Sequence, residues 1–153
     1  MFVLQHEVME EGIMSTVVWY EENRVLFVQH EGVLTHEKVT HWNAIAADLM
    51  DAVPPSVRKV HIILDATKVT AVDLNLKTVL ADPVVQRLVQ HPKYGWGIYV
   101  GNKRNPLYMF FASVIGQKFN EDIKFFDTEL EAVEFLRTQD LDLEHLQVKH
   151  YVY

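Results

Sequence analysis

The chain has no cysteine, and this absence removes several kinds of chemistry at once. A cysteine-free chain has no disulfide framework, no thiol nucleophile and no thiolate metal site. Serine is scarce too, occurring only as Ser15, Ser56 and Ser113, and none of the three lies in a G-x-S-x-G nucleophile elbow. Ser113 falls among phenylalanine and valine residues of a predicted helix, where we expect a small packing residue. The sequence therefore indicates no thiol or serine nucleophile.

Long hydrophobic runs are also missing. The longest apolar stretch, from Leu107 to Ile115, is interrupted by Ser113 and is much shorter than the ~18 residues that a membrane span needs. The first residues, MFVLQHEVMEEGIMS, lack the basic start and long apolar centre of a signal peptide. We expect a cytoplasmic protein with no membrane span.

Basic residues are few, 14 against 21 acidic ones, so the net charge is −7. An acidic chain is a poor binder of the phosphate backbone, and we expect no nucleic-acid partner. The charges are unevenly placed. Residues 1–53 hold nine acids and two bases, residues 54–120 three acids and nine bases, and residues 121–153 nine acids and three bases. The basic middle can bind a small anion or pair with the acidic ends in the fold, and pairing is the simpler interpretation.

The opening third of the chain has the pattern of a β-hairpin followed by a helix. Residues 16–20 and 24–31 are rich in β-forming residues, and a short polar turn joins them. We expect Gly32 to break the second strand, Thr35 to cap the helix, and the prolines at 54 and 55 to stop it. The apolar stripe of this helix consists of Val39, Trp42, Ile45, Ala46 and Leu49.

Strands and helices alternate in the rest of the chain. The apolar run 60–64, which ends at Asp65, predicts a strand buried on both faces, and shorter strands are expected at 97–100 and 123–126. Helices are predicted to begin near Asp73, at Pro83 with Asp82 as cap, at Pro106 with Asn105 as cap, and at the capping box Thr128-Glu129-Leu130-Glu131. The core face of the helix after Pro106 consists of Leu107, Phe110, Phe111, Val114 and Ile115.

This element order predicts an α/β fold with an opening β-hairpin, then alternating α and β, and a mixed, mostly parallel sheet. Neither a repeat nor a linker divides the chain, so we expect a single domain over residues 1–153. Its core spans about 16–137, between an N-terminal extension at 1–15 and a C-terminal tail at 138–153. The β-prone end of the tail, 148–153, can pair with a sheet edge of the same or another chain.

With its segments in these places, the chain resembles the STAS fold of anti-sigma-factor antagonists, and most closely the uncharacterised, stage-II-sporulation-AA-like bacterial branch. The segments are VVWYEENRVLFVQHEGVLT in the hairpin, VHIILDATKV in the central strand and its loop, NPLYMFFASVIGQKF in the third helix, and IKFFDTELEAVEFL in the closing strand and helix. The resemblance covers about residues 16–137. It implies the fold and a regulatory or binding role, although fold alone is a weak warrant for function.

One motif departs from that family. In its switching members an Asp-Ser-Ser-Gly-like turn after the central strand carries the serine that a partner kinase phosphorylates. Here Asp73 matches the aspartate, but Leu74 and Asn75 stand where the serine pair would be, and no glycine follows. Thr67 and Thr70 are nearby hydroxyls outside the motif position. The phosphorylation switch is therefore not carried over.

Histidines suggest a metal site only superficially. His36 and His41 resemble the H-E-x-x-H pattern, but their spacing of five residues puts the two rings about 140° apart on a helix. His30 and His61 are the other histidines that could join them in space. We expect no metal site and no cofactor.

Two carboxylates, Asp65 and Asp73, are predicted near the carboxyl end of the central strand, where open α/β sheets bind ligands. The simpler interpretation is that Asp65 bonds loop amides and that Asp73 caps a helix.

The strongest candidate for ligand binding is the loop Gly101-Asn102-Lys103-Arg104-Asn105, before Pro106. It follows a strand, contains two cations and opens a helix, whose amides and dipole favour an anion. The loop lacks the Gly-Lys-Ser/Thr ending of a Walker motif. An exposed connection with an ordinary helix cap is the simpler interpretation.

Our leading hypothesis is a non-enzymatic STAS-like module that binds a protein partner or itself. The alternative is a carrier of a small anionic or lipid-like ligand, held between the helices and the loop 101–106. A weaker alternative is an enzyme that uses Asp65, Asp73 and Lys103. An apolar pocket would favour the carrier, and a flat apolar patch crossing a two-fold axis would favour the module.

Overall fold

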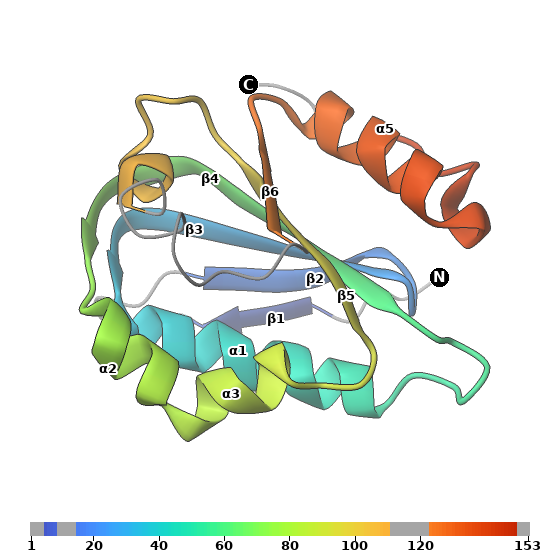
Figure 1. Cartoon of the computed structure of the whole chain (residues 1–153), viewed down its shortest axis with the longest axis horizontal. Helices are drawn as coiled ribbons and strands as arrows, with labels where there is room; N and C mark the ends of the chain where they lie inside the picture. The colour runs from blue at the N-terminus through green and yellow to red at the C-terminus, as the bar shows by residue number, and fades with distance from the viewer. Residues whose placement is uncertain (1–4, 9–14, 111–122, 150–153) are drawn as a thin grey trace.

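The computed structural model describes residues 5–8, 15–110 and 123–149. These residues form one six-stranded sheet whose strands lie side by side in chain order, from β1 to β6 (Figure 1). The pairs β1–β2 and β2–β3 are antiparallel, and the three pairs from β3 to β6 are parallel. The prediction of an α/β fold with an opening hairpin and a mixed, mostly parallel sheet is confirmed.

The hairpin has an additional strand at its outer edge. β2 (Ser15–Glu21) and β3 (Val25–Thr35) form the predicted hairpin, with Asn23 in the turn at φ +64°. β1 (Gln5–Val8) pairs with β2 and lies within the segment predicted to be an extension. Four residues are too short a run for alternation of polar and apolar side chains to identify a strand.

β3 does not end at Gly32, so that prediction is wrong. Gly32 has a φ of +74°, and the register between β3 and β4 shifts on either side of it, which marks a β-bulge within the strand. The buried Lys38 reaches this bulge from the first turn of the next helix. Its ammonium donates to the carbonyls of Glu31, at 2.9 Å, and Val33, at 2.7 Å. Gly32 therefore permits the bend in β3, and the hydrogen bonds from Lys38 stabilise it.

β4 (Val60–Asp73) likewise continues beyond its predicted end at Asp65. Its second half remains paired with the second half of β3, up to the partners Thr35 and Asp73. The strand persists because β3 persists past Gly32. After Ala66 most of its side chains are exposed, so the apolar run that identified the first half stops while the backbone pairing does not.

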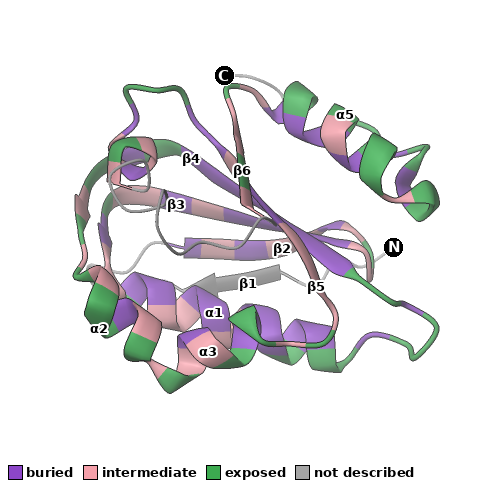
Figure 2. Cartoon of the chain, viewed as in Figure 1, coloured by how far each residue is buried: buried purple, intermediate pink, exposed green. Residues whose placement is uncertain are grey.

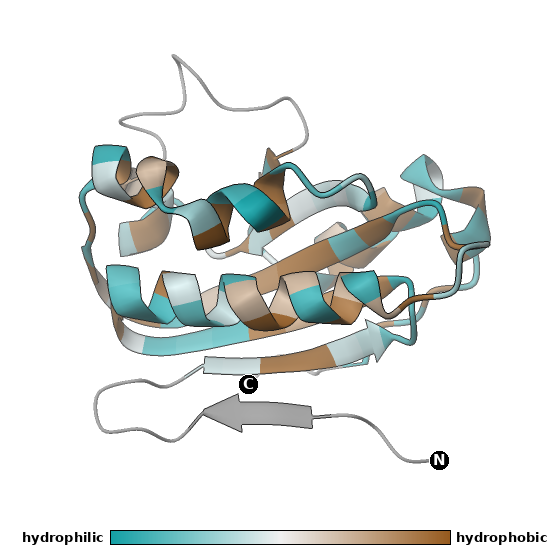
Figure 3. Ribbon diagram, turned by 90° about the horizontal axis from the view of Figure 1, so that it is seen from below, coloured by the Kyte–Doolittle hydropathy of each residue, from teal (hydrophilic) through white to brown (hydrophobic). Residues whose placement is uncertain are grey.

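Three helices follow β3 and β4 on one face of the sheet: α1 (His36–Asp51), α2 (Leu76–Ala81) and α3 (Pro83–Val89). Thr35 caps α1, and Asp82 caps α3 ahead of Pro83, as predicted. α2 begins at Leu76 with Asn75 as its cap rather than near Asp73, because Asp73 still belongs to β4. Seen from below, α1 and the α2–α3 pair lie side by side along the sheet (Figure 3).

The remaining elements are β5 (Tyr94–Val100), helical residues 106–110, β6 (Ile123–Phe126), α5 (Glu129–Gln139) and the 3₁₀ turn η1 (Leu141–Leu143). β6 matches its prediction, and Thr128 caps α5 as expected. The predicted third helix lies outside the described residues from position 111 onward, and this part includes Phe111, Ser113, Val114 and Ile115. Within the described ranges, no helix has the length and hydrophobicity needed to cross a bilayer.

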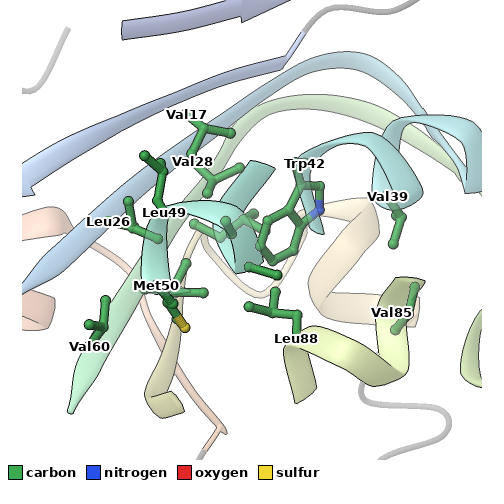
Figure 4. Packing of buried hydrophobic residues seen from close by; sticks show 14 of the residues in the cluster. Val17, Leu26, Val28, Val39, Trp42, Leu49, Met50, Val60, Val85 and Leu88 are labelled. Carbon is green, nitrogen blue, oxygen red and sulfur yellow. The ribbon is translucent and has the colours of Figure 1, made fainter. Parts of the chain in front are cut away.

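Helices on the two faces of the sheet enclose separate apolar cores. On the first face, Trp42 and Met50 of α1 lie among strand residues such as Val28 and the α3 residue Leu88 (Figure 4). On the second face, α5 packs Val133 and Leu136 against the sheet. Adjacent β4 residues serve both cores, since Ile62 belongs to the first and Ile63 to the second. The burial of this strand on both faces is thus confirmed (Figure 2).

The C-terminal tail folds back over the second core. Leu143 and Leu146 are buried there. The Tyr20 hydroxyl of β2 donates to the Glu129 carboxylate at 2.5 Å and accepts the backbone amide of Lys149 at 2.7 Å. Residues 148 and 149 are not part of a strand, and the rest of the predicted β-prone end, 150–153, lies outside the described residues.

Part of the basic middle segment pairs with the acidic first segment. Arg87 of α3 contacts Asp48 and Asp51 of α1, at 2.8 and 2.5 Å. Lys68 of β4 lies 3.4 Å from Glu31 of β3. All of these side chains are well exposed, so the pairs fix geometry more than they stabilise the fold.

Candidate functional site

The predicted anion loop is shaped by the side chains of its two asparagines. Asn105 is buried, donates to the Ala66 carbonyl at 2.6 Å and accepts the Leu107 amide at 2.9 Å. It therefore caps the helix at Pro106, as predicted. Asn102 accepts the Arg104 amide on its side chain, at 2.8 Å, and the Asn105 amide on its carbonyl, at 3.0 Å.

Much of the donor capacity of this loop is already used. Besides the amides of Arg104, Asn105 and Leu107, the Gly101 amide donates to the Phe126 carbonyl at 2.9 Å. Lys103 and Arg104 are exposed, and neither forms an ion pair within the described part of the chain. What the loop offers an anion is therefore mainly the charge of Lys103 and Arg104, because most of its backbone amides are already hydrogen-bonded. Its role as an anion site stays a prediction.

Asp65 lies near this loop but is occupied by its own strand neighbours. Its carboxylate accepts Gln29 Nε2 at 2.9 Å and both the amide and the hydroxyl of Thr67, at 2.8 and 2.6 Å. The residue is only 3% exposed. A carboxylate that accepts three hydrogen bonds in the sheet is suited to holding β3 and β4 together rather than to moving a proton.

Asp73 is not a partner of Asp65. Both belong to β4, and a rise of about 3.3 Å per residue puts roughly 26 Å of strand between them. Asp73 is exposed and pairs in register with Thr35, beside the start of α1. The expectation that both lie near one carboxyl end, with Asp73 as a helix cap, is wrong because the strand is longer than predicted.

The position of the family serine pair falls at the start of α2. Asn75 accepts the Thr78 amide at 3.1 Å as the N-cap, and Leu74 packs against the first core. Thr67 and Thr70 are exposed but lie within β4, a paired strand.

Three of the four histidines considered as metal ligands, His30, His36 and His61, serve different parts of the fold. His36 contacts Asp82 at 2.8 Å, and that carboxylate also accepts the Thr40 hydroxyl at 2.6 Å, which joins α1 to α3. His61 contacts Asp140 in the second layer. Across residues 5–8, 15–110 and 123–149, no group of three or more potential ligands is placed to hold a metal ion.

His30 is buried in the first layer beside Trp42, with ring centres 6.2 Å apart. Its Nδ1 lies 2.8 Å from the Ser15 hydroxyl, and its Nε2 has no partner among the described residues. Burial, with a smaller contribution from the nearby Lys38 charge, lowers the pKa of His30 to about 3. The pair has the residue types of a nucleophile and its base, but Ser15 is 5% and His30 0% exposed, so a substrate has no access.

Sequence analysis overlooked a polar cleft of about 540 Å³ at the other end of the sheet. Its lining includes His61, Trp96, Gln139 and Asp140. The His61 ring accepts the Trp96 amide on Nδ1 at 2.9 Å, so Nε2 carries the proton and donates it to Asp140, also at 2.9 Å. The one sequence signal for this site is His61 itself, a histidine within an apolar run. Its partners Trp96 and Asp140 lie 35 and 79 residues away in the sequence, so no local pattern contains them.

An apolar pocket of about 100 Å³ lies between the first-face helices and the sheet. Most of its lining is aliphatic or aromatic, and its outer part is formed by the residues that are not fully buried, Leu74, Leu76, Leu80, Val89 and Phe110. We call these five residues the α2–α3 groove. Val89 is 49% exposed, so the groove reaches the surface.

Comparison with solved structures decides the fold. The chain matches an uncharacterized protein from the DUF3478 family with a SpoIIAA-like fold, from Shewanella loihica PV-4, with a TM-score of 0.50 and 14% identity over 88% of this chain and 92% of that one. The chain has a SpoIIAA-like fold. Such low identity shows the SpoIIAA-like fold alone and carries no activity across.

A second solved structure is the anti-sigma factor antagonist SpoIIAA in its unphosphorylated form. It matches with a TM-score of 0.44 and 14% identity over 89% of this chain and 98% of that one. No protein-family model matches the chain, and no curated protein matches it. The first of these two matches confirms the resemblance to the STAS fold at the level of the SpoIIAA-like fold.

Proposed function

We propose that this chain is a non-enzymatic regulatory module that binds an apolar segment of a protein partner in the α2–α3 groove. The observation that carries the proposal is the groove itself, an almost wholly apolar pocket that opens to the surface at Val89. Partner-binding surfaces on folded proteins are commonly centred on pockets of this kind, which accept one buried anchor residue.

The size of the pocket favours a side chain over a free ligand. Ligand sites typically enclose about 300–1,000 Å³, whereas this pocket encloses about 100 Å³. A dry cavity of roughly 150 Å³ is enough for a benzene-sized group. The pocket is smaller than even that cavity, so its volume suits a single aliphatic side chain and argues against a lipid-like cargo.

The placement of the carboxylates supports a role other than catalysis. Asp65 is saturated by hydrogen bonds within the sheet, and Asp73 lies far along the same strand. The weaker alternative, an enzyme built on these two residues with Lys103, has no common site to act in.

The SpoIIAA-like fold adds a reason to place the partner here. By the resemblance drawn from the sequence, Leu74 and Asn75 occupy the position of the phosphorylated turn, and Leu74 lines the groove. A partner bound at this position would be held by apolar contact rather than released by a phosphate.

The test is site-specific photocrosslinking in cells that produce the protein, followed by binding of the purified partner. A photoreactive residue at position 89 should capture one discrete protein or a second copy of the chain. The control is position 130, because Leu130 is 53% exposed and belongs to α5 on the opposite face.

The purified partner should then bind Val89→Lys at least tenfold more weakly than wild type, because the charge would enter an apolar contact. Leu130→Lys should bind as wild type does. The proposal would be contradicted if both variants bound the partner equally, or if the captured protein did not bind the wild-type chain once purified.

A further inference from the structure

The His61–Asp140 pair closes a small network that fastens α5 to the sheet. Asp140 is the C-cap of α5, and its other carboxylate oxygen accepts the Asp142 amide of η1 at 3.0 Å. On the sheet side, the His61 ring receives the Trp96 amide at the point where the register between β4 and β5 shifts. One imidazole therefore connects β4, β5 and the end of α5.

The ring fits this place because residue 95 is glycine. A Cβ on Gly95 would lie 2.4 Å from His61 Nδ1, closer than any side chain tolerates. The His61 side chain is 4% exposed and that of Asp140 is 20% exposed. The imidazole is thus packed directly against the β5 backbone and cannot turn without displacing a neighbour.

We propose that His61 is an acid-sensitive latch, which joins the start of β5 to the end of α5 and releases the Trp96 amide of β5 when the imidazole gains a second proton. The neutral ring accepts from Trp96 and donates to Asp140. A proton added to Nδ1 would face the Trp96 N–H across 2.9 Å, so two donors would oppose each other. The ring or the start of β5 must then move, and the cleft changes shape.

Some of the surroundings of the His61 ring lower its pKa and others raise it. Burial lowers the pKa of His61 below its ordinary value, and Lys59 assists, whereas Asp140 opposes the change. Burial alone would raise the pKa of Asp140, but its hydrogen bonds to His61 and the Asp142 amide, together with the charges of His61 and Arg24, outweigh burial and lower it. The other titratable or charged groups in or beside the cleft are Arg58, Tyr94 and Asp142, which pairs with Arg24 at 2.9 Å. The carboxylate therefore stays charged while the imidazole titrates below pH 6.5.

Amide hydrogen exchange between pH 7.5 and pH 4.0, corrected for intrinsic rates, tests the latch. The protonation state of His61 is followed in parallel by NMR of the ring carbons. Protection of the Trp96 amide should fall at least tenfold as His61 becomes protonated, whereas the Asp140 amide, which donates to Leu136, should keep its protection because the charged pair holds it. His61→Gln offers one donor and one acceptor but no proton site, so its protection should not change with pH.

Two further variants keep the test decisive if that glutamine destabilises the fold. Asp140→Asn retains an acceptor but loses the charge, so release should move to lower pH, with at least a threefold weaker proton affinity at His61. His36→Gln alters the histidine paired with Asp82 on the other face and should leave the Trp96 amide unchanged. The latch is refuted if His61 stays neutral to pH 4.0, or if Trp96 keeps its protection after His61 is protonated.

Discussion

His30 shows how one residue can make the stability of this fold depend on pH. Its ring is fully buried between Ser15 and Trp42, and its Nε2 has no partner among the described residues. In the unfolded chain the same ring is hydrated and titrates near 6.5. The folded-state pKa of about 3 is therefore lower than the unfolded one.

We predict that acidification destabilises the wild type more than His30→Leu. Between pH 6.5 and 3 the unfolded state binds a proton that the folded state excludes, so stability rises with pH and is lost as pH falls. At pH 5 this single group should cost about 2 kcal/mol of unfolding free energy, since each pKa unit is worth ~1.4 kcal/mol. Urea unfolding at pH 7 and pH 5 measures the difference.

The control for this experiment is His145→Gln, because the His145 side chain is 93% exposed. That variant should retain the full pH dependence of the wild type. An unchanged pH dependence in His30→Leu would show that the buried ring is protonated in the fold.

At the scale of elements, the bulge in β3 decides where α1 begins. Gly32 bends the strand, and Lys38 donates to the carbonyls of the residues on either side of this glycine. Thr35, which lies between Gly32 and Lys38 in the sequence, caps α1. These contacts join the end of β3 to the first turn of α1. A buried lysine held by carbonyls has no sequence signature, since an isolated lysine early in a helix is normally exposed.

We predict that Lys38→Met lowers the unfolding free energy by about 2–3 kcal/mol. Two carbonyls would lose their donor, and each unsatisfied buried polar group costs ~1–3 kcal/mol. The matched control is Lys77→Met on α2, where the lysine is exposed and the change should stay within ~0.5 kcal/mol. Denaturant unfolding compares the two. A fully stable Lys38→Met would mean that desolvation of the ammonium offsets its bonds.

The loop 101–105 remains the element on which sequence analysis placed an anion. Its exposed cations and helix start predict weak, roughly millimolar binding of free phosphate, because salt screens exposed charges within ~8–10 Å. Titration with phosphate at low salt should shift the NMR amide signals of Gly101, Asn102 and Asn105 first.

The double change Lys103→Ala, Arg104→Ala should abolish those shifts and leave the fold intact, since both side chains are exposed. If the largest shifts fall elsewhere, or survive this change, the loop is only a connection.

For the whole molecule, local patterns predicted the order of elements, and long-range pairing decided their lengths and the sites. The caps at Thr35, Asp82, Asn105 and Thr128 are local signals, and each is confirmed. The extension of β4 beyond Asp65 depends on β3, about 36 residues earlier, so no local window contains it. The same holds for the His61–Asp140 pair.

The order of the sheet has a consequence for how the protein is made. Each new strand pairs with the strand synthesised just before it, so the sheet can grow as the chain leaves the ribosome. Contacts to the C-terminal tail form later, and the Tyr20 hydroxyl must wait for an amide 129 residues later. At ~5–20 residues per second, that delay is roughly 6–26 s. During this interval the second core lacks Leu143 and Leu146, so part of its apolar face stays uncovered until the tail is made.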